Sequence, residues 1–288
     1  MVGTPFLRID SHAHVFERGL KTVRNPRYVP GYSATPEEYL AVLDGNGFAG
    51  GVLVQPSFLG ADNSFLLSVL AAAPEMLRGV IVVNEQYLAS ELSEERLAEL
   101  RDLGIRGVRL NLLEQPLPDL SARAWQEAAG RMSAYGWHLE IQAAGGQWAE
   151  LCSVLQRWPS PLVIDHLGLP HRDEPDAKQV VLELANQEHV WIKVSAPYRS
   201  SGNEAESVLT GIIDDAGADR LLFGSDWPST RNEGHTFANM VAWAARQLGG
   251  DLLEKVMTIN PMRLFGWPDA RLWESHPGSS VAAMARKR

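Results

Sequence analysis

The chain has 288 residues, of which 45% are hydrophobic and 21% are charged, and its formal net charge is −9. This composition is that of a globular protein and excludes a disordered chain, and the acidic balance argues against nucleic acid or an anionic membrane as a partner. A single cysteine, Cys152, excludes an intrachain disulfide. We see no signal-peptide pattern and no apolar run of about 18 residues, so we expect a cytoplasmic protein without a membrane span.

Short apolar runs rich in Val, Ile and Leu recur along the whole chain and predict buried parallel strands. After the first run they return about every 25–30 residues, which is the length of one strand–helix unit. The eight runs are Leu7–Ile9, Gly51–Val54, Gly79–Val83, Gly107–Leu110, Trp137–Ile141, Leu162–Ile164, Val190–Val194 and Arg220–Phe223.

Segments with helical periodicity separate these runs. Residues suited to begin a helix precede three of them, at Thr35, Ser90 and Ser121. Glycines suited to end a helix close four, at Gly47, Gly104, Gly136 and Gly217. The clearest helical segments are Pro36–Gly47, Glu91–Leu103, Ala122–Tyr135, Gln147–Arg157, Asp176–Gln187 and Glu204–Ala216.

Eight strands that alternate with helices predict an α/β fold, either a closed barrel or an open sheet. The first strand is not followed by a glycine-rich phosphate-binding pattern, which weakens an open dinucleotide-binding sheet. The length is close to the roughly 250 residues of a typical α/β barrel. We therefore expect a single (β/α)8 TIM barrel over residues 1–267, and a C-terminal tail, residues 268–288, that is partly disordered.

One long segment, Phe16–Ser33, interrupts the rhythm directly after the first strand. Loops of this length in a compact domain are either functional lids or mobile segments. We expect this one to fold over the barrel mouth and to add positive charge there, the alternative being a solvated, mobile loop. Its relevant side chains are those of Arg18, Lys21, Arg24, Arg27 and Tyr28.

Polar side chains follow the predicted strands, at the end where α/β barrels carry their chemistry. His12 and His14 are two residues apart on an extended segment, so both should face the barrel interior. His166 follows the sixth run and Asp226 follows the eighth. Taken singly, His166 could be a structural histidine and Asp226 could cap a helix. Together they predict a site at one mouth of the barrel.

Arg109, at the end of the fourth run, should face the same pocket. An unpaired arginine there is costly unless an anionic substrate arrives, and the alternative is a structural ion pair with Glu140 or Glu114. His138 lies near the start of its strand and should face the opposite end of the barrel.

Four segments of the chain resemble the amidohydrolase superfamily, of the amidohydrolase-2 type. They are Ile9-Asp-Ser-His-Ala-His14, Val163-Ile-Asp-His166, Leu222-Phe-Gly-Ser-Asp-Trp-Pro228 and Ile259-Asn-Pro-Met-Arg-Leu-Phe-Gly266. Two further segments, Gln55-Pro-Ser57 and Gly107-Val-Arg109, narrow the resemblance to the branch of 2-pyrone-4,6-dicarboxylate lactonases and sugar lactonases. The resemblance runs from about Leu7 to Trp267.

This resemblance implies a hydrolase that opens a lactone ring. It assigns the role of base toward water to Asp226 and places His12, His14 and His166 on the lactone carbonyl. It also implies that Ser57, Arg109 and Arg199 bind substrate carboxylates.

The chain departs from the lactonase pattern at two places. Asn111-Leu-Leu-Glu114-Gln occupies the region of a second arginine, and Glu140, with Gln142 beside it, stands where the lactonases have a tyrosine. We include both Glu140 and Gln142 among the expected substrate contacts. Because one carboxylate-binding group is missing, a lactone with one acidic group or a sugar lactone fits equally well.

We expect no obligatory metal, because positioned cations and an activated water can suffice for an ester-like carbonyl. The alternative is a single zinc or manganese ion on His12, His14 and Asp226. The rival functions are a metal-dependent amidohydrolase or decarboxylase of a cyclic acid, and a barrel that only binds a small acid. The expected partner is a small, anionic molecule. The sequence does not decide between a monomer and a homo-oligomer.

Overall fold

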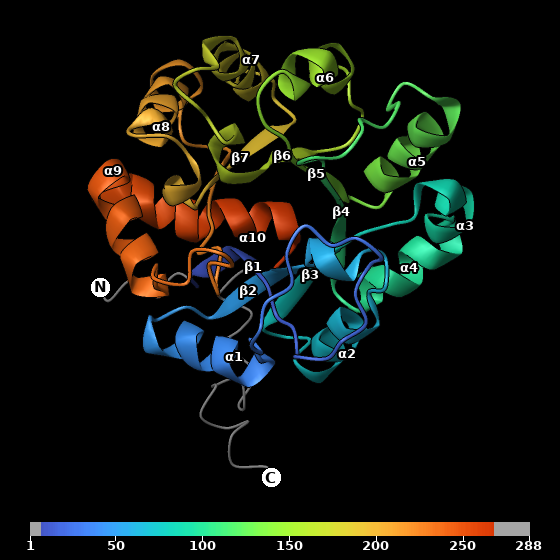
Figure 1. Cartoon of the computed structure of the whole chain (residues 1–288). Coiled ribbons are helices and arrows are strands. Elements are labelled where there is room, and N and C mark those ends of the chain that lie inside the picture. Colours follow the sequence, from blue (N-terminus) through green and yellow to red (C-terminus); the bar gives the residue numbers. More distant parts are fainter. Residues whose placement is uncertain (1–6, 268–288) are drawn as a thin grey trace, which may run out of the picture.

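The computed structural model describes residues 7–267, and in it the strands form one sheet whose order follows the chain, with helices around it (Figure 1). All seven neighbouring pairs are parallel. The last strand returns to the first, since Asp226 N–H donates to the His12 carbonyl (2.9 Å) and His14 N–H donates to the Trp227 carbonyl (2.7 Å). The predicted (β/α)8 barrel is therefore confirmed. The tail predicted for residues 268–288 lies outside the described residues.

The strands begin and end close to the predicted apolar runs, and the first shows the largest difference. They are β1 Ile9–Ala13, β2 Gly50–Val54, β3 Leu77–Ile81, β4 Ile105–Asn111, β5 His138–Gln142, β6 Leu162–Ile164, β7 Val190–Val194 and β8 Leu221–Phe223. The run Leu7–Ile9 was expected to be the first strand, but β1 continues through Asp10, Ser11 and His12, all of them buried. The polar side chains of β1 have partners inside the barrel, so a search for apolar runs does not recognise this part of the strand.

Helices lie between successive strands, and two more follow the last strand. They are α1 Pro36–Gly45, α2 Ser64–Ala72, α3 Leu88–Glu91, α4 Glu94–Asp102, α5 Arg123–Ala134, α6 Gln147–Leu155, α7 Pro175–Ala185, α8 Glu204–Ala216, α9 Phe237–Met257 and α10 Ile259–Phe265. Thr35 caps α1 as predicted, with a reciprocal bond to Glu38. None of the described helices is long and apolar enough to cross a membrane.

Two predicted helix starts were wrong. Ser90 lies inside the short helix α3, and α4 begins only at Glu94, where the Ser93 side chain accepts the Arg96 N–H. Ser121 does not cap α5, because its hydroxyl bonds to Asp119 instead. The glycine endings were right: Gly47, Gly104, Gly136 and Gly217 all have φ between +67° and +94°, which glycine adopts without steric cost.

The end of the barrel where the strands begin is closed by apolar side chains. Phe265 of α10 and Trp267, just after it, pack with Ile9, Val52 and other barrel residues in one buried cluster. His138 lies at this end, with its ring 5.4 Å from that of Phe265, as predicted from its place at the start of β5. The mouth at the carboxyl ends of the strands is thus the end available for a ligand.

The loop Phe16–Ser33 folds over this mouth (dark blue in Figure 1). Phe16 and Ala34 pair through two backbone hydrogen bonds, which close the base of the loop. Phe16 and Ala34 also pack with Phe58 and Leu59 of η1 (Ser57–Leu59) in a separate apolar cluster. The loop is thus anchored at its base and on the segment after β2.

Candidate active site

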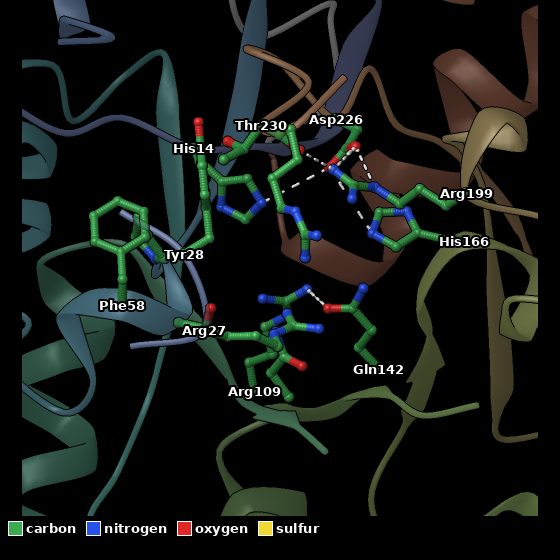
Figure 2. Close-up of a pocket in the computed structure, with 14 residues that line it drawn as sticks. His14, Arg27, Tyr28, Phe58, Arg109, Gln142, His166, Arg199, Asp226 and Thr230 are labelled. Atoms are coloured by element: carbon green, nitrogen blue, oxygen red, sulfur yellow. Dashed lines mark hydrogen bonds and ion pairs between the residues drawn. The ribbon is translucent and has the colours of Figure 1, made fainter. Parts of the chain in front are cut away.

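A pocket opens at the carboxyl mouth of the barrel, between the strand ends and the loop Phe16–Ser33 (Figure 2). Figure 2 shows Arg109 and Gln142 on one side of it and Asp226, Arg199 and His166 on the other. The pocket is lined by His14, Arg27, Tyr28, Pro56, Ser57, Phe58, Arg109, Asn111, Gln142, His166, Arg199, Asp226, Thr230 and Arg231.

The two carboxylate oxygens of Asp226 have different surroundings. Oδ2 accepts from the hydroxyl of Tyr198 (2.7 Å) and from Nε of Arg199 (2.8 Å). Oδ1 instead lies 3.8 Å from Nε2 of each of three histidines, His12, His14 and His166. Oδ2 is thus engaged by the protein, while Oδ1 faces the imidazoles at a distance too long for a direct hydrogen bond.

Asp226 does not cap a helix, which was the alternative reading of this residue. The next helix, α9, begins at Phe237 and is capped by Thr236. The backbone of Asp226 is left-handed (φ 57°), as is that of His166 (φ 52°). Such conformations are uncommon for residues other than glycine and are kept where the surrounding structure fixes them, often at functional sites.

The charge state of Asp226 follows from its neighbours. Burial raises the pKa of this carboxyl, but the Arg199 guanidinium, followed by the three imidazoles, outweighs burial and holds the pKa well below its usual range. The carboxylate is therefore ionised at neutral pH, and it is a weak base.

A directional chain of hydrogen bonds runs through the first two histidines. Nζ of Lys193 lies 2.9 Å from Nδ1 of His12, and because an ammonium only donates, this nitrogen accepts. Nδ1 of His14 lies 2.7 Å from the Val54 carbonyl, to which it must donate. The ring proton of His12 is therefore on Nε2 and points at Nε2 of His14, 3.2 Å away.

His14 and His166 are expected to be neutral at pH 7. Burial is the largest cause that lowers the pKa of each from 6.5 to about 4; Arg109 adds to the effect at His14, and Asp226 opposes it at both. Since unfolded histidines take up protons near pH 6.5, the unfolded state binds more protons between pH 6.5 and 4. The melting temperature should fall as the pH falls through this window.

Thermal unfolding between pH 7.5 and 4.5 checks this expectation, with the imidazole carbon shifts followed by NMR. The His166→Asn variant has no imidazole to protonate at this position, so its melting temperature should depend less steeply on pH. Protonation of both rings near pH 6.5 in the folded protein would contradict the burial argument.

Two overlapping groups of side chains bring ligand atoms near enough to hold a divalent ion. They are His12, Asp165 and His166, and His12, His14 and Asp226. A metal on the second group needs the Nε2 lone pair of His12, yet the bond from Lys193 to Nδ1 puts a proton on that nitrogen. Asp165 Oδ1 also lies 3.2 Å from Nδ1 of His12. A proton on Nδ1, donated to that oxygen, would leave Nε2 of His12 free to bind a divalent ion.

Beneath the pocket lies a buried network of charges. Lys193 Nζ contacts Glu140 Oε2 (2.5 Å) and Asp165 Oδ1 (3.3 Å), with all three side chains fully buried. Arg109 donates from Nε to Asp165 Oδ2 (2.9 Å) and from Nη2 to Gln142 Oε1 (2.7 Å). This network fixes the floor of the site from β4, β5 and β7 and the turn after β6.

Arg109 lines the pocket as predicted, but the expectation that it is unpaired was wrong. It forms ion pairs with Asp165 and, at 3.4 Å, with Glu140, one of the two partners considered. Among the described residues no partner bonds to its remaining nitrogen, Nη1. That nitrogen is the part of Arg109 left for a ligand.

The other expected site residues fall into two groups. Ser57, Gln142 and Arg199 line the pocket together with His14, His166 and Asp226. His12 lies beneath the lining, within the hydrogen-bond chain. Glu140 is not at the pocket: its carboxylate is wholly buried between Lys193 and His138. Of the five loop side chains named for the mouth, only Arg27 and Tyr28 line the pocket.

Several residues that position the site were not predicted from the sequence. Asp10 accepts from the Ser225 hydroxyl (2.6 Å) and the Tyr39 hydroxyl (2.9 Å), which ties β1 to the segment that carries Asp226. Burial raises the pKa of Asp10 to about 6, although these bonds lower it. Lys193 carried a visible signal, because it is a charged residue within an otherwise apolar strand.

One glycine lets the last strand end close to the histidine pair. A Cβ built on Gly224 would lie 2.8 Å from Cβ of His12 and 3.2 Å from Cβ of Ser195. A larger residue would push β8 away from β1 and β7. The close approach places Asp226 within reach of all three imidazoles.

Comparisons with known proteins show which family the chain belongs to. The amidohydrolase family model matches residues 9–267. A 2-pyrone-4,6-dicarboxylate hydrolase of Comamonas testosteroni is 30% identical over 287 residues, covering 91% of this chain and 90% of the relative. A 4-sulfomuconolactone hydrolase of Rhizobium radiobacter is 28% identical over 277 residues, covering 89% of each.

A solved structure is similar over nearly the whole barrel. It is that of a probable 2-pyrone-4,6-dicarboxylic acid hydrolase from Acinetobacter baumannii with citric acid bound. Its TM-score is 0.82 at 32% identity, and the match covers 90% of this chain and 99% of that one. With a family match that spans residues 9–267, this chain belongs to the amidohydrolase family.

Proposed function

We propose that this protein is a lactone hydrolase that opens the ring of a small, carboxylated lactone similar to 2-pyrone-4,6-dicarboxylate. The observation that carries the proposal is the placement of Asp226 Oδ1, which faces three imidazole nitrogens at 3.8 Å in a pocket lined by four arginines. The named activities of the relatives at 28–32% identity support the same reaction.

The reaction begins with a water between Asp226 Oδ1 and the lactone carbonyl. Asp226 accepts a proton as the water oxygen bonds to the carbonyl carbon. Of the three imidazoles, only that of His166 has its Nε2 free of a hydrogen bond to any residue that the structure describes. Ser195 bonds to its Nδ1 (2.7 Å), whereas the Nε2 atoms of His12 and His14 bond to each other. With the Ser195 hydroxyl as donor, His166 carries its proton on Nε2 and donates to the developing oxyanion.

Ring opening completes the reaction. The bond between the carbonyl carbon and the ring oxygen breaks, and Asp226 returns its proton to the leaving oxygen. One water is consumed, and the products are a hydroxyl group and a carboxylic acid, which releases its proton to solvent at neutral pH. Nη1 of Arg109 and the Ser57 hydroxyl, both at the pocket, orient an acidic arm of the substrate.

The low basicity of Asp226 favours a reactive substrate. Because Arg199 holds the pKa of Asp226 far below neutral, the carboxylate is a weak general base toward the water. An ester carbonyl with a stabilised leaving oxygen, as in a conjugated lactone, needs less help than an amide does. The site therefore suits lactone hydrolysis better than amide hydrolysis.

Turnover of lactones tests the proposal directly. We expect the purified protein, treated with a chelator and checked for metal content, to hydrolyse 2-pyrone-4,6-dicarboxylate, with acid release followed by a pH indicator. A sugar lactone and a dihydroxybenzoate are the comparison substrates for the two rival activities. Loss of turnover on chelation and its return with zinc or manganese would favour the metal-dependent alternative, and absence of lactone turnover would reject the proposal.

A further inference from the structure

We propose that Arg27 and Arg231 form a second anion-binding site at the outer rim of the pocket, which selects lactones that carry two acidic groups. The inference rests on the proposed function and deepens it. Arg27 comes from the loop after β1 and Arg231 from the loop after β8, and both line the pocket.

Basic side chains outnumber the carboxylates that bind them at the pocket. Among the side chains that line the pocket and the buried network directly beneath it, five are basic and three are carboxylates, and Glu114 and Glu233 lie nearby outside the lining. Each of the three carboxylates already has a cationic partner. Arg109 pairs with Asp165, Lys193 with Glu140, and Arg199 with Asp226. The guanidiniums of Arg27 and Arg231 form no ion pair or hydrogen bond with any residue in the described part of the chain.

The backbone holds Arg231 in place at the rim. Arg231 has a left-handed backbone (φ 68°), and its N–H donates to Glu233 Oε1 at 2.9 Å. The same oxygen accepts from the hydroxyls of Tyr28 (3.3 Å) and Tyr32 (3.0 Å). Glu233 is thus turned toward the backbone and the loop tyrosines, and the Arg231 guanidinium lies 5.9 Å from the centre of the Tyr28 ring.

Arg27 lies among other cations at the rim. Burial lowers its pKa, and the neighbouring charges of Arg109, Arg231 and Arg199 lower it further, against an opposing effect of Glu114. A cation surrounded by other cations is stabilised when an anion binds between them. Arg27, Ser57 and Asn111 also line an adjoining cavity under the loop, which gives room for a substituent of the substrate ring.

These positions assign the two acidic groups of the substrate to different arginines. Nη1 of Arg109, on the floor, binds one group, and Arg27 with Arg231 binds the other at the rim. The rim pair takes the place of the second arginine that the sequence lacks after β4. A lactone with one acidic group uses only one of the two subsites.

The test uses three lactones and three arginine variants. The substrates are 2-pyrone-4,6-dicarboxylate and its two monocarboxylates, 2-pyrone-4-carboxylate and 2-pyrone-6-carboxylate. The variants are Arg27→Met, Arg231→Met and, as a matched control from the same loop, Arg24→Met, which does not line the pocket.

For the dicarboxylate we expect each rim variant to lower kcat/KM by about tenfold or more, mainly through KM, since a bond to a charged group is lost. The monocarboxylate whose acidic group binds to Arg27 and Arg231 should show the same loss of kcat/KM. The other monocarboxylate lacks that group, and its kcat/KM should be unchanged. Arg24→Met should match the wild type on all three. Equal losses on both monocarboxylates, or none on the dicarboxylate, would overturn the assignment.

Binding measured on the Asp226→Asn protein separates this inference from the proposed reaction. Calorimetric Kd values for the three pyrones, with and without Arg231→Met, should show the same pattern without turnover. If the wild type hydrolyses none of the lactones while this pattern holds, the rim site stands and the reaction fails. Binding that is indifferent to Arg231 rejects the rim site alone.

Discussion

Replacing Asp226 with asparagine is expected to lower kcat by at least about two orders of magnitude, because general-base help is commonly worth about 10²–10⁴-fold. Asparagine keeps the shape of the side chain and can still bond to Tyr198 and Arg199, but it cannot take the proton from water. The measurement is steady-state hydrolysis of the best acidic lactone.

Substrate binding provides the control for this variant. Nη1 of Arg109 and the rim arginines do not depend on the Asp226 charge, so the Kd for the intact lactone should change far less than kcat. Thermal unfolding should confirm that the variant is folded. An Asp226→Asn protein with the wild-type kcat would refute the base role, because the structure leaves Asp226 no helix to cap.

Replacing Lys193 with methionine is expected to lower the free energy of unfolding by about 3–5 kcal/mol, the cost of removing one partner from a buried ion pair. Lys193, Glu140 and Asp165 are fully buried, so no water can solvate the two carboxylates that the substitution leaves behind. Urea unfolding at pH 7 measures the loss.

Two comparisons separate the loss of charge pairing from loss of packing. Lys255 pairs with Asp219 at the surface, and Lys255→Met should cost less than about 1 kcal/mol. The double variant Lys193→Met with Glu140→Gln should be more stable than the sum of the two single changes predicts, since it removes both members of a pair. Strict additivity would show that the two side chains do not interact.

The barrel could be predicted because its signal is local. A parallel strand covered on both faces is apolar along its length, and β6 and β7 have the bounds that their apolar runs predicted. The register of β1 could not be read in this way, since Asp10, Ser11 and His12 are buried through contacts with residues far along the chain. Asp10 bonds to Ser225, 215 positions away.

The positions of His14, His166 and Asp226 in the site were predictable because each follows a strand, and the strand ends of a barrel meet at one mouth. The hydrogen-bond and ion-pair partners of the site residues could not be predicted from the sequence. Whether Arg109 is free or paired depends on Asp165, which is 56 residues away, and the tautomer of His12 depends on Lys193, 181 residues away. Glu140 was misplaced because strand alternation does not tell how deep in the barrel a side chain lies.

Glu233 connects the two sides of the pocket entrance. A single exposed carboxylate holds both Tyr28 and Tyr32 of the loop after β1 and the backbone of Arg231 after β8. The two sides of the entrance are therefore joined through one side chain, and separating them requires breaking the bonds of Glu233. Exposed hydrogen bonds of this kind contribute about 1 kcal/mol or less each, so the connection that Glu233 makes across the entrance is weak.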